Sequence, residues 1–196
     1  MTDLGDLLVV GLGNPGERYA GTRHNVGADA VITVAAGNDI RLRADSKTSS
    51  FSGDGRLGGV RAHLAIPTTY MNDSGRAVSQ LLRRHELQGW DRLVVVHDEL
   101  DLDPGVVKLK SGGGLAGHNG LRSISGHLHT QEFARIRIGV GKPPGGSDKG
   151  ANWVLSKVFG EAREVLSDSV QRASDAIEAI ATDGIDAAMA TFNARR

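Results

Sequence analysis

The sequence has 196 residues with 23 basic and 23 acidic side chains, so its formal net charge is zero. It contains no cysteine, which excludes disulfides, a thiolate nucleophile and a zinc site with cysteine ligands. No apolar run is long enough for a membrane span, and the acidic start of the chain does not have the pattern of a secretory signal. We therefore expect one domain over residues 1–196, in the cytoplasm.

The charges are unevenly distributed along the chain. Residues 104–157 hold eight basic and two acidic side chains, whereas residues 91–103 and 161–186 hold an excess of carboxylates. A protein of zero net charge can therefore have one positive face, and a nucleic-acid partner is not excluded.

The hydrophobic pattern predicts alternating strands and helices. Residues 6–12 and 92–97 are almost continuously apolar, which is typical of strands buried on both faces. Such strands need helices on both sides, so we predict a three-layer α/β/α fold. The other elements expected, in chain order, are a helix at 25–36, two weaker strands within 51–66, a helix at 72–87, strands at 106–110 and 133–140, and helices at 161–181 and 186–193.

A glycine-rich turn follows the first predicted strand. Residues 11–16 read Gly-Leu-Gly-Asn-Pro-Gly, which matches the glycine spacing of dinucleotide-binding proteins. In those proteins a helix begins directly after the turn, but residues 17–23 are polar and contain another glycine. The turn therefore fits an NAD-dependent oxidoreductase poorly, and we keep that class only as a weak alternative. A turn with a purely structural role is a second alternative.

Histidine is the best candidate for a catalytic base, because the sequence has no nucleophile motif and imidazole titrates near neutral pH. His24 follows the glycine-rich turn between polar neighbours, whereas histidines 63, 85, 127 and 129 are expected to lack polar partners. Asp98 follows the second buried strand and is the best carboxylate to orient His24. A solvated acidic turn and a metal site using His24, His97, Asp98 and Glu99 are the alternatives; we expect no metal, because His97 and Asp98 point to opposite faces of a strand.

Five segments, taken together and in order, resemble the bacterial peptidyl-tRNA hydrolase family. They are the turn at 11–16, Thr-Arg-His-Asn at 22–25, Tyr-Met-Asn-Asp-Ser-Gly at 70–75, His-Asp-Glu-Leu-Asp at 97–101 and Gly-Gly-Gly-Leu-Ala-Gly-His-Asn-Gly at 112–120. The resemblance implies a central mixed β-sheet between helices, in a monomer without cofactor. The implied enzyme hydrolyses the ester bond of peptidyl-tRNA, with no protein partner and no membrane involved.

The resemblance also implies roles for particular residues. The base would be His24, oriented by Asp98, and Asn14 would distinguish blocked from free aminoacyl ends. The residues implied to bind the peptide and the tRNA are Tyr19, Tyr70, Met71, Asn72, His118, Asn119, Lys110 and Arg137, the last from the strand at 133–140.

The chain departs from the family pattern near the expected tRNA side. Leu115 and Ala116 interrupt the glycine-rich loop, and Lys142 stands before proline where relatives often have histidine. These differences concern contacts with the nucleic acid and leave the expected reaction unchanged. The strongest alternative of another class is a non-catalytic RNA-binding protein that uses the basic region alone.

Overall fold

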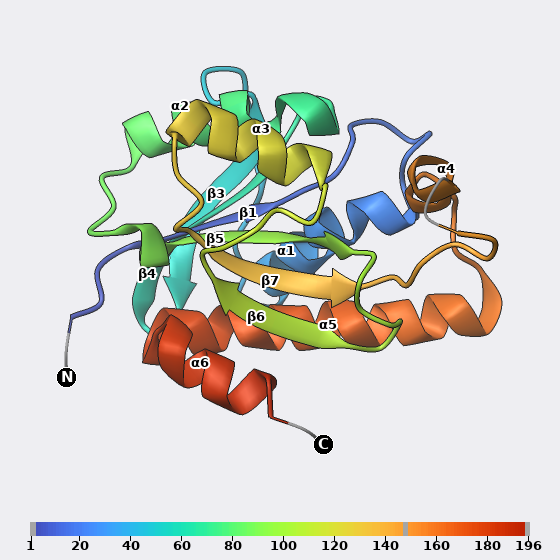
Figure 1. The fold of residues 1–196 in the computed structure, drawn as a ribbon. Coiled ribbons are helices and arrows are strands. Elements are labelled where there is room, and N and C mark those ends of the chain that lie inside the picture. The colour runs from blue at the N-terminus through green and yellow to red at the C-terminus, as the bar shows by residue number, and fades with distance from the viewer. Residues whose placement is uncertain (1–2, 147–148, 195–196) are drawn as a thin grey trace.

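The computed structural model describes residues 3–146 and 149–194 and has a seven-stranded mixed sheet at its centre. The strands lie in the order β2-β3-β4-β1-β5-β7-β6 (Figure 1). β1 is parallel to β4 and β5, β5 is parallel to β7, and the other pairs are antiparallel. The bounds are β1 Leu7–Gly11, β2 Arg43–Asp45, β3 Ser50–Leu57, β4 Val60–Pro67, β5 Leu93–Glu99, β6 Val107–Ser111 and β7 Ala134–Gly139.

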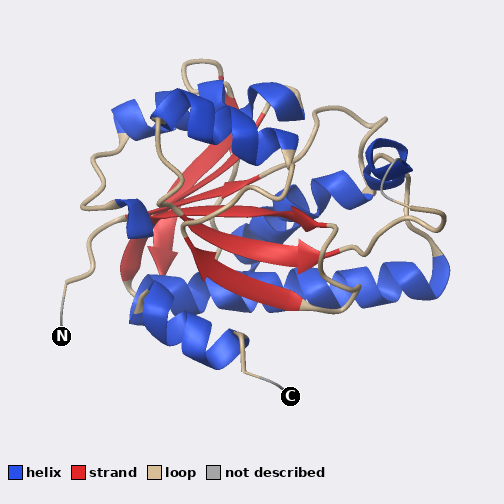
Figure 2. Cartoon of the chain, in the orientation of Figure 1, coloured by secondary structure: helices blue, strands red, loops and turns tan. Residues whose placement is uncertain are grey.

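Helices cover both faces of the sheet, which confirms the three-layer prediction (Figure 2). α2 and α3 cover one face, and α1, α5 and α6 cover the other. The bounds are α1 Val26–Gly37, α2 Ser74–Arg84, α3 Asn119–Leu128, α4 Gly150–Val154, α5 Gly160–Asp183 and α6 Ile185–Phe192. Short 3₁₀ turns lie at Arg23–Asn25, Met71–Asp73 and Trp90–Arg92.

The central strands divide their side chains between two hydrophobic cores. In β1, Leu8 and Val10 pack with α2 and α3, whereas Leu7 and Val9 pack with α1 and α5. This alternation follows from the two-residue period of a strand. All four side chains are fully buried, which explains why the sequence shows one continuous apolar run.

Several predicted boundaries differ from the structure. The strand expected at 92–97 continues to Glu99, so Asp98 and Glu99 are buried strand residues and a solvated acidic turn is wrong for them. The exposed turn begins only after Glu99 and carries Asp101 and Asp103. The helix expected at 72–87 begins with a 3₁₀ turn and ends at Arg84. β2, α3 and α4 were not predicted. α3 contains two glycines and two serines, which are weak helix formers, so its pattern gives little local signal.

Helix α1 packs unusually close to the sheet at Gly11 and Gly27. A Cβ atom on Gly27 would collide with the carbonyl oxygen of Val96 in β5, and one on Gly11 would collide with that of Gly27. The first turn of α1 therefore lies against the backbones of β1 and β5. Because the 3₁₀ turn Arg23–Asn25 leads directly into α1, this approach fixes the turn above the carboxyl ends of those strands. Among the described residues, no helix combines the length and apolar character needed to cross a membrane.

The close approach of α1 gives a stability prediction. Gly27→Ala is expected to lower the free energy of unfolding by about 1–3 kcal/mol, the usual cost of overpacking, because the added methyl group meets rigid backbone. Gly37→Ala is the control, since it lies at the end of the same helix with open space around it, and there the change should be neutral or slightly stabilising. Urea denaturation measures both, and equal stabilities would contradict the packing account.

Candidate active site

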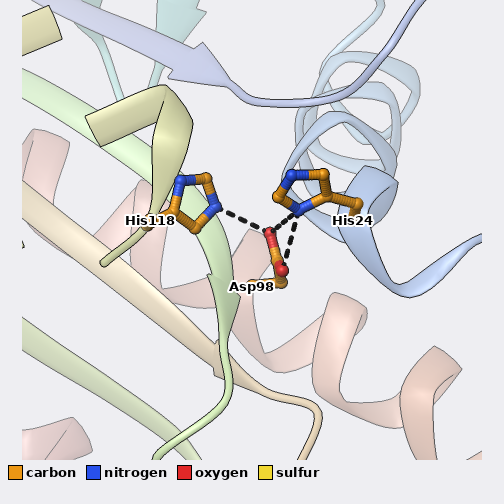
Figure 3. A group of neighbouring side chains, drawn as sticks. All are labelled: His24, Asp98 and His118. Atoms are coloured by element: carbon orange, nitrogen blue, oxygen red, sulfur yellow. Dashed lines mark hydrogen bonds and ion pairs between the residues drawn. The ribbon is translucent and has the colours of Figure 1, made fainter. Parts of the chain in front are cut away.

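His24 and Asp98 form a buried pair at the carboxyl edge of the sheet (Figure 3). His24 lies in the 3₁₀ turn before α1, and Asp98 lies in β5. The Nδ1 atom of His24 is 2.8 and 2.9 Å from the two carboxylate oxygens of Asp98. An ionised carboxylate only accepts hydrogen bonds, so Nδ1 donates the proton and Nε2 keeps its lone pair. His24 is thereby held in the tautomer that can take a proton through Nε2.

His118 is the second hydrogen-bond donor to the same carboxylate. Its Nε2 lies 2.8 Å from Oδ1 of Asp98, and its Nδ1 accepts hydrogen bonds from the backbone N–H groups of Gly120 and Leu121. Because backbone N–H groups only donate, Nδ1 must carry the lone pair and Nε2 the proton. His118 therefore caps the N-terminus of α3 and anchors Asp98 at once.

The two imidazoles control the ionisation of Asp98. Burial alone would raise the pKa of this carboxyl group, but the charge and hydrogen-bond contributions of His118 and His24 outweigh it and hold the pKa well below its usual range. Asp98 is 3% exposed, so water screens these interactions weakly. The carboxylate therefore stays ionised and gives the site a fixed negative charge.

The neighbouring His97 belongs to the other side of β5. Its Nδ1 lies 2.8 Å from the backbone oxygen of Asp98, and its ring is 1% exposed. Burial, with a smaller contribution from His118, lowers the pKa of His97 to about 3, so the ring is neutral. The side chain of His97 is not among the ligand-type groups that lie close to His24. The alternative metal site with His24, His97, Asp98 and Glu99 is therefore not formed.

Two groups of ligand-type side chains come together in the described part of the chain. In the first, His24, Asp98 and His118, a metal on Nε2 of His118 would force the proton onto Nδ1, against two N–H donors, so the observed tautomer opposes coordination.

In the second group, Asp54, His63 and His85, the two rings stack with centroids 3.7 Å apart, so their nitrogens do not point to a common position. The expectation that His63 lacks polar partners is wrong, since its Nδ1 lies 2.8 Å from Asp54.

Asn14 is oriented by backbone contacts on both sides. Its side-chain oxygen accepts a 2.7 Å hydrogen bond from the backbone N–H of Met71, which leaves the amide NH₂ group as the donor of a side chain that lines the adjacent pocket. The side chain of Asn25 exchanges two hydrogen bonds of 2.9 Å with the backbone of Asn14. Asn25 was not predicted as a site residue, and its position next to His24 was the available signal.

The amide side chains expected at the site do meet around His24. A pocket of about 420 Å³ is lined by Asn14, His24, Tyr70, Met71, Asn72, Asn119, Ala151, Val154 and Leu155. A second hollow shares His24, Asn119, Ala151 and Val154 with this pocket and is also lined by Asp98 and His118. Tyr19 lies edge-on to Tyr70 with ring centroids 6.3 Å apart, and Tyr70 is 61% exposed. The pocket beside His24 therefore combines amide side chains with apolar ones.

Lys110 and Arg137 lie together in a neighbouring hollow. This hollow shares Glu99 and Ala116 with the one beside His24, so the two adjoin. The buried Nε of Arg137 has no hydrogen-bond partner among the described residues. Arg135, from the same strand, instead binds the backbone oxygens of Gly113 and Gly114 and supports the glycine-rich loop.

An imidazole aligned by a buried carboxylate, beside a pocket lined by amide side chains, is the arrangement that hydrolytic enzymes use for general-base catalysis. Residues 8–196 match the Peptidyl-tRNA hydrolase family. The chain belongs to this family.

Individual relatives agree over nearly the whole length. The peptidyl-tRNA hydrolase of Cutibacterium acnes is 45% identical over 196 residues, which cover 95% of this chain and 97% of the relative. That of Mycolicibacterium gilvum is 43% identical, with 96% and 97% covered. The crystal structure of peptidyl-tRNA hydrolase from Acinetobacter baumannii is 36% identical, with a TM-score of 0.92 and 100% and 98% of the two chains covered.

The double role of His118 gives a prediction for catalysis. His118→Ala is expected to reduce kcat about 10-fold or more, because Asp98 loses one of its two donors and orients His24 less well. The lost cap should also lower stability by about 1 kcal/mol. His127→Ala, in the exposed part of the same helix, is the control and should leave kcat unchanged. Single-turnover hydrolysis with saturating enzyme measures the effect, and an unchanged rate would mean that Asp98 needs only His24.

Proposed function

We propose that this protein hydrolyses the ester bond between the peptide and the terminal ribose of peptidyl-tRNA, with His24 as general base. The observation that carries the proposal is the pairing of His24 Nδ1 with both oxygens of Asp98, beside a pocket lined by three asparagines. This arrangement leaves Nε2 to take a proton from water. The water oxygen then attacks the ester carbonyl carbon, so no covalent enzyme intermediate is needed.

The second half of the reaction returns the same proton. The attack gives a tetrahedral intermediate with a negative oxygen and a His24 imidazolium, which the charge of Asp98 stabilises. When the intermediate collapses, the carbon–oxygen bond to the ribose breaks and His24 gives the proton to the departing ribose oxygen. The products are free tRNA and a peptide with a carboxylate, and the base is regenerated.

The asparagines suit stabilisation of the developing charge. Asn14 presents its NH₂ group, because Met71 holds its oxygen, and Asn72 and Asn119 line the same pocket. Loss of one donor to an oxyanion typically costs about 10²–10³ in rate. Of the three asparagines, we favour Asn14 as the donor to the oxyanion, because its orientation is fixed.

Selectivity for a blocked amino end follows from the cost of burying charge. A peptidyl nitrogen is a neutral amide, whereas a free aminoacyl end carries an ammonium group that is costly to bury without a partner. The pocket beside His24 is lined by neutral amide, aromatic and apolar side chains apart from His24 itself. We therefore infer preference for N-blocked substrates, without a metal or cofactor, by a monomer in the cytoplasm.

The assay that tests the proposal compares N-acetyl-aminoacyl-tRNA with plain aminoacyl-tRNA. Release of free tRNA from the first, and little from the second, is expected. A non-catalytic RNA-binding protein would bind both and cleave neither, which would overturn the proposal.

Removal of the base should abolish most of the activity. His24→Ala is expected to lower kcat by about 10³ or more, because proton transfer to a positioned base is lost while the pocket remains. Asp98→Asn should also be severe but milder, since the base survives without the charge that stabilises its imidazolium. Tryptophan fluorescence and tRNA binding should match the unmutated protein. Activity of His24→Ala within tenfold of the unmutated protein would remove the general-base assignment.

The hollow with Lys110 and Arg137 is proposed to hold a phosphate of the tRNA. Replacing both with alanine should weaken binding and reduce the slope of log affinity against log salt by roughly 0.7–0.9 for each lost contact. Lys108→Ala is the control on the same strand, because its ammonium group binds the backbone of Asn193 instead.

The effect on catalysis should depend on the substrate. The double variant should raise KM for tRNA substrates but act normally on a peptide esterified to a single nucleoside. Equal impairment on this minimal substrate would place Lys110 and Arg137 in the reaction centre or the fold.

A further inference from the structure

The segment that carries α4 is attached to the turn that holds His24. α4 spans only Gly150–Val154, which is too short to be stable by itself, so its position depends on tertiary contacts. Thr22 and Lys157 form an isolated antiparallel bridge, and the backbone N–H of Arg23 donates to the oxygen of Ser156. In Figure 1, α4 accordingly lies beside the loop that leads into α1.

The side chain of Arg23 makes the most direct contact between the two segments. Its guanidinium carbon lies 3.5 Å from the centroid of the Trp153 ring, and its Nη1 donates a 2.6 Å hydrogen bond to Oγ of Ser156. The indole nitrogen of Trp153 donates in turn to the backbone oxygen of Gly141, 3.0 Å away. The ring is thereby fixed on its face by a cation and at its edge by the backbone.

The same segment supplies apolar side chains to the pocket beside His24. Ala151 and Val154 of α4 and the following residue, Leu155, line this pocket together with the three asparagines. Val154 is buried, whereas Leu155 is 42% exposed and therefore has apolar surface that a ligand can cover. Trp153, held by Arg23, lies between Ala151 and Val154 in the sequence, so a shift of the ring would move this apolar surface relative to His24.

We propose that Arg23 is a positioning residue that holds the wall formed by Ala151, Val154 and Leu155 in place to contact the peptidyl side chain next to the ester. Arg23 itself does not line the pocket in the described structure. Its effect on the reaction passes through the placement of α4. The inference rests on the proposed ester hydrolysis for its kinetic part, and on geometry alone for the position of Trp153.

The first measurement concerns only the position of Trp153. The chain has two tryptophans, so Trp90→Phe leaves Trp153 as the single reporter. In this background Arg23→Met, which keeps the length and removes the charge, is expected to shift Trp153 emission to longer wavelength and to increase quenching by acrylamide. Arg23→Lys keeps a cation without the planar fork and should give an intermediate result. Unchanged emission and quenching in Arg23→Met would overturn the proposal.

The second measurement separates binding from chemistry. With N-acetyl-leucyl-tRNA, Arg23→Met is expected to raise KM by about 10-fold, the effect of losing a small apolar contact, while kcat changes less than twofold. With N-acetyl-glycyl-tRNA, which has no side chain at this position, KM should change little. Arg83→Met is the matched control, because Arg83 is exposed and binds within its own helix α2.

Other outcomes would contradict the positioning role. An equal rise in KM for both substrates would mean that Arg23 contacts the tRNA, and a collapse of kcat at constant KM would mean that it acts on His24. If Arg23→Met does not fold, Ser156→Ala is the second variant; it removes the acceptor of the Arg23 hydrogen bond together with the hydroxyl that donates to the backbone oxygen of Trp153, and it should change Trp153 emission and KM in the same direction. If the unmutated protein cleaves neither substrate, the proposed function fails, and the emission of Trp153 still decides whether Arg23 holds α4.

Discussion

The ionised carboxylate of Asp98, buried between two imidazole N–H groups, is the interaction on which the rest of the site depends. A buried negative charge is costly unless it is hydrogen-bonded, and the ring N–H groups of His24 and His118 both donate to it. Each histidine is itself fixed, His24 by the turn into α1 and His118 by the backbone N–H groups of α3. The cluster of His24, Asp98 and His118 therefore requires that helices from opposite faces of the sheet meet at β5.

The sheet creates that meeting point through its topology. β1 and β5 are adjacent and parallel, so their carboxyl ends lie side by side, where open α/β sheets usually place their sites. Gly11 and Gly27 let α1 contact the strand backbones directly, and this brings the turn with His24 over Asp98. Ala151 and Val154 of the short helix α4 also line the pocket beside His24. Fold stability and site geometry thus share the same contacts, and substitutions at Gly27 are expected to affect both.

Much of this arrangement was predictable from local patterns. The apolar runs at 6–12 and 92–97 indicated buried strands. The polar residues after the first glycine turn argued against a dinucleotide site, and the structure agrees, because α1 begins only at Val26. His24, Asp98 and the asparagines were selected by residue type and by resemblance, and they lie together. The sequence did not predict the end of β5 or the helix α3, and the glycine-rich sequence of α3 gives only a weak helix signal. The bond of His118 to Asp98 was also missed, because a histidine that caps a helix has no distinctive sequence pattern.

The sequence by itself determined the alternation of strands and helices, the class of chemistry and the candidate base, because these follow from side-chain periodicity and residue type. Only the tertiary structure decided how the ionisable groups pair. His24 and His118 lie 74 and 20 positions from Asp98, and nothing local specifies that both donate to one carboxylate. The tautomer of each ring, the ionisation of Asp98 and the contact between Arg23 and Trp153 arise from distances across the fold. Hydrogen bonding and burial act through space, so they become definite only when the sheet and its helices are packed.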